Sequence, residues 1–176
     1  MNRINHLSAM VFFTWFLSLI FSTASHAHLM APHKGTLNFD DTGGYLVLSL
    51  PSSAFLKFDE NNDNQLTMKE IKTRQQEIIS FITKSIYLTE KNKKTYLSGA
   101  LLAPQKSHTK EQNTVEQIVV IGKFLSPLSN STTLNASLFG DTEKSKELTV
   151  MASNKSSNLK HIFKLNEQQT SQRLFH

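Results

Sequence analysis

The sequence contains no cysteine. Without a sulfur nucleophile or ligand, a chain cannot form disulfides, thiolate zinc sites, iron–sulfur clusters or a lipoprotein anchor, and it cannot use thiol catalysis. Any bound metal must therefore be held by oxygen or imidazole ligands. The chain has 176 residues, of which 39% are hydrophobic. A chain of this length can bury a core without covalent cross-links, so we expect one ordinary globular domain.

Long apolar runs are scarce, and the one that stands out lies near the amino terminus. Leu7–Phe21 is apolar apart from a few polar side chains, and it is followed by Ser25 and Ala27, the small residues that a signal peptidase recognises. The run has about 15 residues, whereas roughly 20 are needed to span a bilayer. We therefore expect residues 1–27 to be a cleaved signal peptide, with no stable membrane span after cleavage. A transmembrane anchor is the alternative.

A strong excess of charge of one sign is also absent. The net charge is +5, and lysine and arginine are scattered along the chain instead of being gathered in one motif. An exported chain with such a distribution is not expected to bind nucleic acid.

Downstream of residue 27, apolar and polar residues alternate along several short segments, as in half-buried antiparallel strands. A turn at Asp40–Gly44 joins the first two segments into a hairpin. The strands expected from this pattern are Thr36–Phe39, Tyr45–Leu50, Thr95–Ala103, Val115–Leu125, Thr133–Phe139, Glu147–Ala152 and Leu159–Leu165.

One segment follows a helical period instead. Between Thr67 and Ile86, methionine and isoleucine recur at helical spacings, and charged residues occupy most of the remaining circumference. This pattern predicts a surface helix about five turns long with one buried stripe. After Leu165 the alternation is lost, so residues 166–176 are expected to form a flexible tail.

Directly before this helix lies a twelve-residue segment, Asp59–Glu70, that is rich in oxygen-bearing side chains. Alternate residues of a tightly curled loop can point inward together, and a hard cation such as calcium prefers about six to eight oxygen ligands. Position 7 would contribute its backbone carbonyl, and the glutamate at position 12 could bind with both carboxylate oxygens. The expected ligands at positions 1, 3, 5, 7, 9 and 12 are Asp59, Asn61, Asp63, Gln65, Thr67 and Glu70.

Apolar residues flank the loop on both sides, and in a helix–loop–helix unit such residues tie the loop to the core. The loop and these flanks together resemble the EF-hand family over about residues 52–86. With the segment His28–Gly35 at the expected mature start, the chain resembles small exported bacterial proteins that carry a single EF-hand. The resemblance implies a periplasmic or secreted protein that binds Ca²⁺ and acts as a binding or interaction module with an unidentified protein partner. It implies no enzymatic activity. The flanking apolar residues are Phe55, Phe58, Leu66 and Ile71.

The motif departs from the family at three points. Asn64 replaces the usual glycine at position 6, where the turn needs a positive φ that asparagine tolerates. Pro51 limits the entering helix to about two turns. The sequence has no second calcium loop, although EF-hands usually occur in pairs. A polar turn that caps the helix at Asp63 or Thr67 without binding metal is the alternative.

Histidines suggest a second kind of metal site. If cleavage follows Ala27, the amino group and imidazole of His28 could chelate copper, with His33 or His161 as a further ligand. Enzyme signatures such as a nucleophile elbow, a phosphate loop or His-Glu-x-x-His are missing from the sequence.

These patterns predict an α+β fold in one domain over residues 28–165. We expect an antiparallel sheet or sandwich of about seven strands, with the EF-hand loop and the long helix inserted after the second strand. Only three of the expected ligands are charged, so calcium binding should be weak, in roughly the 10⁻⁵ to 10⁻³ M range, and structural in role.

Overall fold

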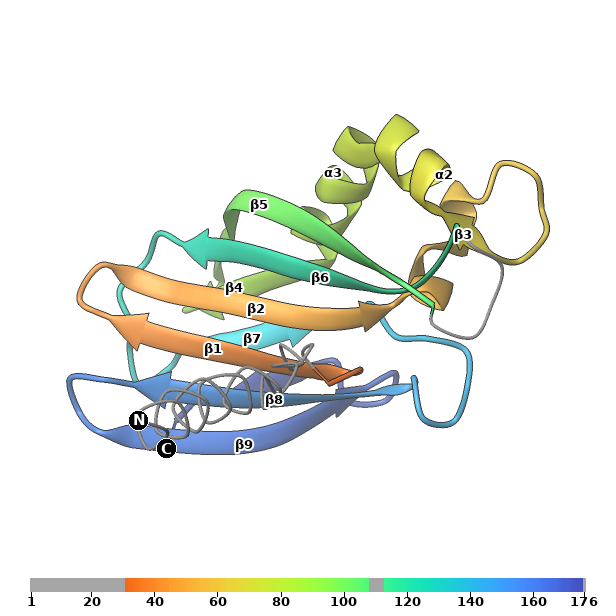
Figure 1. Cartoon of the computed structure of the whole chain (residues 1–176). Helices are drawn as coiled ribbons and strands as arrows, with labels where there is room; N and C mark the ends of the chain where they lie inside the picture. Colours follow the sequence, from red (N-terminus) through yellow and green to blue (C-terminus); the bar gives the residue numbers. More distant parts are fainter. Residues whose placement is uncertain (1–30, 108–112, 176) are drawn as a thin grey trace, which may run out of the picture.

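The computed structural model of the chain describes residues 31–107 and 113–175. Most of this part of the chain forms one curved β-sheet, with a few short helices at one end (Figure 1). The expected signal peptide and His28 lie outside the described residues. In chain order, the elements are β1 (Lys34–Asp40), β2 (Gly43–Pro51), the 3₁₀ helix η1 (Ser52–Phe58), β3 (Leu66–Thr67), α2 (Met68–Thr73), α3 (Gln75–Ser85), β4 (Ile86–Glu90), β5 (Lys93–Lys106), β6 (Thr114–Phe124), β7 (Thr133–Ala136), β8 (Glu147–Asn154), β9 (Leu159–Asn166) and β10 (Ser171–Arg173).

The sheet has ten strands, nine of them in the order β10-β7-β4-β5-β6-β2-β1-β8-β9, while β3 pairs with β6 beside this path. Neighbouring strands are antiparallel, except that β1 and β8 run parallel. The two ends of the order approach each other, because Nδ1–H of His161 on β9 donates to the carbonyl of Leu174, just after β10, at 2.7 Å. The sheet is therefore close to a closed barrel. This architecture confirms a β-rich α+β fold in outline, with more strands than the sequence suggested.

The hairpin between β1 and β2 forms as the sequence predicts. The Asp40 carboxylate accepts the backbone N–H of Thr42 at 2.7 Å, which closes a short turn. Gly43 follows with φ 135°, and a Cβ at this position would collide with the carbonyl of Phe124 on β6. Only glycine can both adopt this φ and let the two backbones approach so closely.

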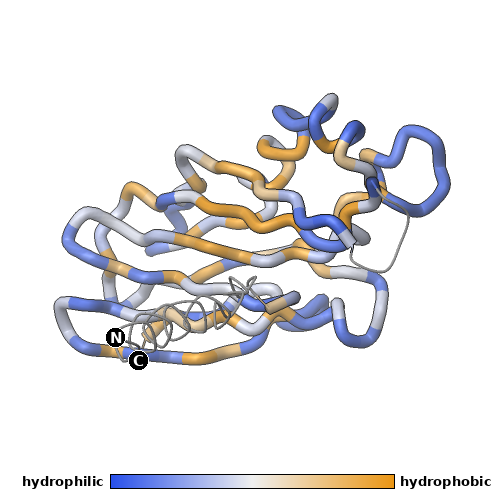
Figure 2. Tube along the Cα trace, viewed as in Figure 1, coloured by the Kyte–Doolittle hydropathy of each residue, from blue (hydrophilic) through white to orange (hydrophobic). Residues whose placement is uncertain are grey.

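The hydrophobic core lies on the inner side of the curled sheet. Alternate residues of the strands, such as Leu37, Leu46 and Leu48, are fully buried there. Ile78 and Ile82 of α3 are also fully buried and cover one end of this core. Figure 2 shows these apolar stretches in the middle of the strands and in α3. Alternate residues of the strands and one face of α3 therefore line the same core.

The single long helix predicted over Thr67–Ile86 is wrong, because the chain forms two helices and then a strand. The helical conformation is interrupted at Arg74, where φ is −102° and ψ is 18°. The N–H of Arg74 closes the last turn of α2 on the Glu70 carbonyl, and the Arg74 carbonyl accepts the N–H of Ile78 in α3. Ile86 belongs to β4, whose β-branched and aromatic residues favour a strand.

The flexible tail predicted for residues 166–176 is also wrong for its described part. Asn166 still belongs to β9, and β10 pairs with β7 through residues 171–173. Leu174 is fully buried, and its N–H donates to the Thr132 carbonyl at 3.0 Å. The tail thus completes the core. None of the helices in the described ranges is long and apolar enough to cross a membrane.

Candidate functional site

The predicted calcium loop projects from the end of the sheet between η1 and α2 (Figure 1). Its outermost part is hydrophilic and stands clear of the strands (Figure 2). The entering element is short, as the sequence predicted, because Pro51 ends β2 and η1 spans only Ser52–Phe58. The loop therefore begins one residue after η1, at Asp59.

The Asp59 carboxylate is the centre of the first half of the loop. Its Oδ1 accepts the backbone N–H groups of Asn61 at 3.2 Å and Asn62 at 2.9 Å, and its Oδ2 accepts the N–H of Asn64 at 2.8 Å. Three backbone donors thus converge on one side chain. This convergence curls the chain around position 1 of the loop.

Positions 3 and 5 join the same network. Asp63 donates its backbone N–H to Oδ1 of Asn61 at 3.2 Å, and the Asn61 side-chain amide donates to Oδ2 of Asp63 at 2.8 Å. Oδ1 of Asp63 in turn accepts the N–H of Gln65 at 2.8 Å. The structure therefore brings the predicted ligands at positions 1, 3 and 5 into one short, hydrogen-bonded segment.

The backbone adopts the strained conformation that the sequence predicted at position 6. Asn64 has φ 61°, in the left-handed region that favours glycine. Asn62 has φ 59° as well, which the sequence analysis did not anticipate. Asparagine tolerates this region better than most residues, so the run of asparagines makes the tight curl possible.

The second half of the loop is joined to the sheet through β3. Leu66 pairs with Val115 and Thr67 with Thr114, both on β6. The Thr114 hydroxyl also donates to the side-chain oxygen of Gln65 at 3.4 Å. The Gln65 side chain is thus engaged with β6. This leaves its backbone carbonyl as the ligand to be expected at position 7.

Glu70, at position 12, caps the start of α2 together with Thr67. Oε2 of Glu70 accepts the backbone N–H of Thr67 at 2.8 Å and its hydroxyl at 2.7 Å, and the N–H of Glu70 donates back to the Thr67 hydroxyl at 3.2 Å. Oε1 accepts the N–H of Glu60 at 3.0 Å. Burial raises the pKa of Glu70, but hydrogen bonds from the side chain and backbone of Thr67 and from the loop backbone outweigh it and hold the pKa below its usual value. Glu70 is therefore a buried, ionised carboxylate at the base of the loop.

The apolar flanks hold the loop against the core, as predicted. Phe55, Phe58, Leu66 and Ile71 are all buried. The ring of Phe58 meets Phe81 of α3 edge-on, with 5.8 Å between ring centroids. Both ends of the loop are therefore fixed to the body of the protein.

Arg74 is a contributor that the sequence analysis missed. At the break between α2 and α3, its guanidinium binds Glu77 at 2.6 Å and lies 3.6 Å from Glu60 at loop position 2. The spacing of three residues to Glu77 is visible in the sequence, but the contact with Glu60 depends on the helix break. Thr114 was also missed, because its partner Gln65 lies 49 residues earlier in the chain.

The donor set suits a hard cation, because it consists of carboxylate, amide, hydroxyl and backbone carbonyl oxygens. The carboxylates themselves are not gathered: among residues 31–107 and 113–175, no three His, Cys, Asp or Glu side chains form a group that could hold a metal. Glu70 is instead engaged with Thr67 and Glu60. The residues that would hold calcium are the six predicted from the sequence: Asp59, Asn61, Asp63, Gln65, Thr67 and Glu70.

The copper alternative depends on His28 together with His33 or His161. His28 lies outside the described residues. His33 directly precedes Lys34, the first residue of β1. The strand registers place Lys34 beside Thr149 on β8 and Thr149 beside Lys164 on β9. His161 lies three residues before Lys164, two strands away from β1. At about 4.8 Å per strand and 3.3 Å per residue, the Cα atoms of His33 and His161 are more than about 10 Å apart. His161 packs against Phe163, with 5.2 Å between ring centroids.

No family model matches the chain, and no curated protein matches it.

Proposed function

We propose that the protein is an exported calcium-binding module in which calcium has a structural role. The observation that carries the proposal is the loop Asp59–Asn64, where backbone N–H groups at positions 3, 4 and 6 converge on the carboxylate at position 1. A capping turn needs only the Thr67–Glu70 pair and gives no reason for the first half of the loop to curl in this way. The proposed setting is the periplasm or the exterior, and no catalytic role is proposed.

The chemistry of the loop supports calcium over other metals. Calcium, when bound, supplies a centre for six to eight oxygens from flexible ligands, whereas magnesium demands a stricter octahedron and zinc prefers nitrogen and sulfur. Asp59, Asp63 and Glu70 provide the negative charge. With only these three charged ligands, the expected affinity is weak, with a Kd of roughly 10⁻⁵ to 10⁻³ M.

A structural role follows from how the loop is anchored. β3 joins the loop to β6, Phe58 and Ile71 tie its ends to the core, and Glu70 is already buried. A weak site filled in a calcium-rich compartment rarely empties, so it acts as a clamp between η1, α2 and the sheet instead of a switch.

Calorimetric titration of calcium into wild type, Glu70→Gln and Glu60→Gln tests the proposal. Glu70→Gln keeps size and helix propensity but removes the charge and bidentate geometry that calcium selects, so we expect at least a tenfold loss of affinity. Glu60→Gln removes one charge from position 2 of the same loop, which holds no ligand, and should change the affinity less than threefold. Equal losses in the two variants would mean that only the net charge of the loop matters.

Asn64→Gly should change the calcium affinity in the opposite direction. Glycine relieves the strain of φ 61° at position 6, so it should strengthen the fold and the calcium affinity by up to about 1 kcal/mol. If wild type and Asn64→Gly both take up no calcium at millimolar concentrations, the segment is a capped polar turn and the proposal is wrong.

A further inference from the structure

The outer face of the sheet carries a row of side chains across six neighbouring strands, and all of them are apolar except a threonine on β1. The strand registers place the members of this row directly beside one another from β5 through β6, β2, β1 and β8 to β9. These positions alternate with the buried core positions of the same strands, so their side chains point away from the core. We call this set the outer row, and it consists of Leu101, Ile121, Val47, Thr36, Met151 and Ile162.

The outer row is open to solvent. Leu101 is 64% exposed, Ile121 43% and Ile162 61%, while Val47 and Met151 are half-buried. A single exposed aliphatic residue needs no explanation, but five apolar residues in one row of a sheet face, interrupted only by Thr36, indicate an interaction surface. The core of the described part is complete without these side chains, so folding does not account for them.

Lysines border the outer row on both sides. On the side toward the β1–β2 turn, the next outward positions include Lys123 on β6 and Lys160 on β9. On the opposite side they include Lys34 on β1 and Lys164 on β9. Each lysine has a long apolar stem, so it can lie along the row and still place its charge at the border.

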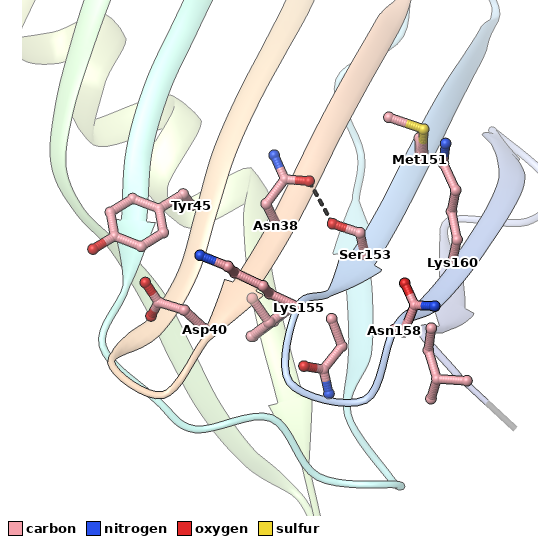
Figure 3. Close-up of a pocket in the computed structure, with 11 residues that line it drawn as sticks. Asn38, Asp40, Tyr45, Met151, Ser153, Lys155, Asn158 and Lys160 are labelled. Atoms are coloured by element: carbon pink, nitrogen blue, oxygen red, sulfur yellow. Dashed lines mark hydrogen bonds between the residues drawn. The ribbon is translucent and has the colours of Figure 1, made fainter.

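The lysines of this face outnumber the carboxylates beside them, although Lys164 is paired with Glu147. Glu147 is engaged with Lys164 at 2.8 Å, and Asp40 accepts hydrogen bonds from Thr42. Figure 3 shows the border near the β1–β2 turn, where Lys155 and Lys160 lie beside Asn38 and Ser153. These residues help to line a cavity of about 500 Å³. The border is therefore basic, hollowed and rich in hydrogen-bond donors.

We propose that the outer row and its lysine borders dock this protein on a bilayer that contains anionic lipid. The apolar side chains enter the boundary between headgroups and acyl chains, and the lysines bind lipid phosphates. A bilayer offers phosphates on every side of an inserted apolar patch, which matches a row with lysines along both borders. A second copy of the chain would instead set lysine against lysine. This inference rests on a different face from the calcium loop and does not depend on the proposed function.

Vesicle co-sedimentation tests the proposal with the chain from His28 onward, which contains every described element. We expect binding to phosphatidylcholine vesicles with 30% phosphatidylglycerol, weaker binding at higher salt, and little binding to pure phosphatidylcholine. The double variants Leu101→Asn with Ile162→Asn and Lys34→Gln with Lys160→Gln should each bind at least fivefold more weakly. Thermal melts of each variant verify that it is folded.

Matched controls distinguish binding by this face from a general effect of positive charge. Lys69→Gln with Lys72→Gln removes two exposed lysines from α2 and should change binding less than twofold. An equal loss in this control would mean that only the net charge attracts the protein to the vesicle, and the proposal would be wrong. Absence of binding to the anionic vesicles would overturn it as well. Binding of an acidic polyglutamate peptide in place of vesicles, with the same losses, would assign the face to an acidic protein instead.

A fluorescence measurement reports insertion directly. Trp15 is the single tryptophan of the sequence and precedes His28, so Ile162→Trp gives the shortened chain one tryptophan. Its emission should shift to the blue on anionic vesicles. Tyr96→Trp, at a position 48% exposed on β5 where that strand pairs with β4, should not shift. Equal shifts at both positions would rule out docking by the outer row.

Discussion

At the scale of single residues, His33 carries a strain that its surroundings do not relieve. It stands just before β1 with φ 57°, in the left-handed region. Within the part of the chain that the structure describes, its buried Nδ1 has no hydrogen-bond partner. Burial lowers the pKa of His33, because a charged imidazolium would lose its hydration there. The fold therefore favours the neutral form of this side chain.

This neutral state predicts a pH dependence of stability. The pKa of His33 is lower in the folded protein than its unfolded value of about 6.5. Below that pH the unfolded chain therefore binds more protons than the folded chain. This uptake stabilises the unfolded chain relative to the folded one. The free energy of unfolding should fall as the pH drops from about 7.5 to 5.5. His33→Asn, which tolerates the same φ, should reduce this fall, as measured by urea denaturation at both pH values. Identical slopes in the two proteins would show that His33 titrates alike in both states.

At the scale of elements, the carboxyl-terminal segment closes the sheet. β10 pairs with β7, and the residues after it bring Leu174 into the core and its carbonyl to His161 on β9. These contacts join the two ends of the strand order. The segment has little apolar pattern of its own, because it contributes through a few buried side chains and backbone hydrogen bonds.

Substitutions in this segment distinguish a structural strand from a loose end. Leu174→Ala removes a fully buried side chain and should destabilise the protein by about 2–5 kcal/mol. Gln168→Ala, at an exposed position between β9 and β10, should change stability by less than about 0.5 kcal/mol. Chemical denaturation measures both. If Leu174→Ala were as stable as wild type, the result would support the flexible tail that the sequence suggests.

Local patterns in the sequence were enough to predict most strands and the loop. The β1–β2 hairpin, the alternation of β8 and β9, and the positive φ of Asn64 each depend on residues close together in the chain. The contact of Arg74 with Glu60 and the pairing of β10 with β7 join segments that are distant in the chain. Periodicity carries no information about such partners, so it extended the helix through the break and left the terminal strand unassigned.

At the scale of the whole molecule, the proposed calcium loop and the sheet form one connected structure. The loop reaches β6 through β3, and β6 lies in the middle of the strand order. An ion held by the loop would therefore stabilise the complete fold and not the loop alone, since only the folded chain assembles the ligands.

Calcium should raise the melting temperature accordingly. At a free calcium concentration one hundred times Kd, linkage adds about 2.7 kcal/mol to the free energy of unfolding. For a domain of this size, that corresponds to an increase of about 5–10 °C. Differential scanning calorimetry with and without a chelator measures it, with Glu70→Gln as the control whose increase should be clearly smaller. An equal increase in Glu70→Gln would place the effect outside the loop.

The pairing of β3 with β6 also affects the order in which the sheet assembles and the loop takes its final shape. The chain is synthesised amino terminus first, so Asp59–Glu70 is available well before β6: Gln65 and its partner Thr114 are separated by 49 residues. Local hydrogen bonds shape Asp59–Asn64 and the Thr67–Glu70 cap. The pairing of β3 with β6 joins distant residues, and closing such a distance is a slow, entropically opposed step. Metal capture would then come late in biogenesis, after most of the sheet has assembled, and an emerging chain would have to remain unaggregated without help from calcium.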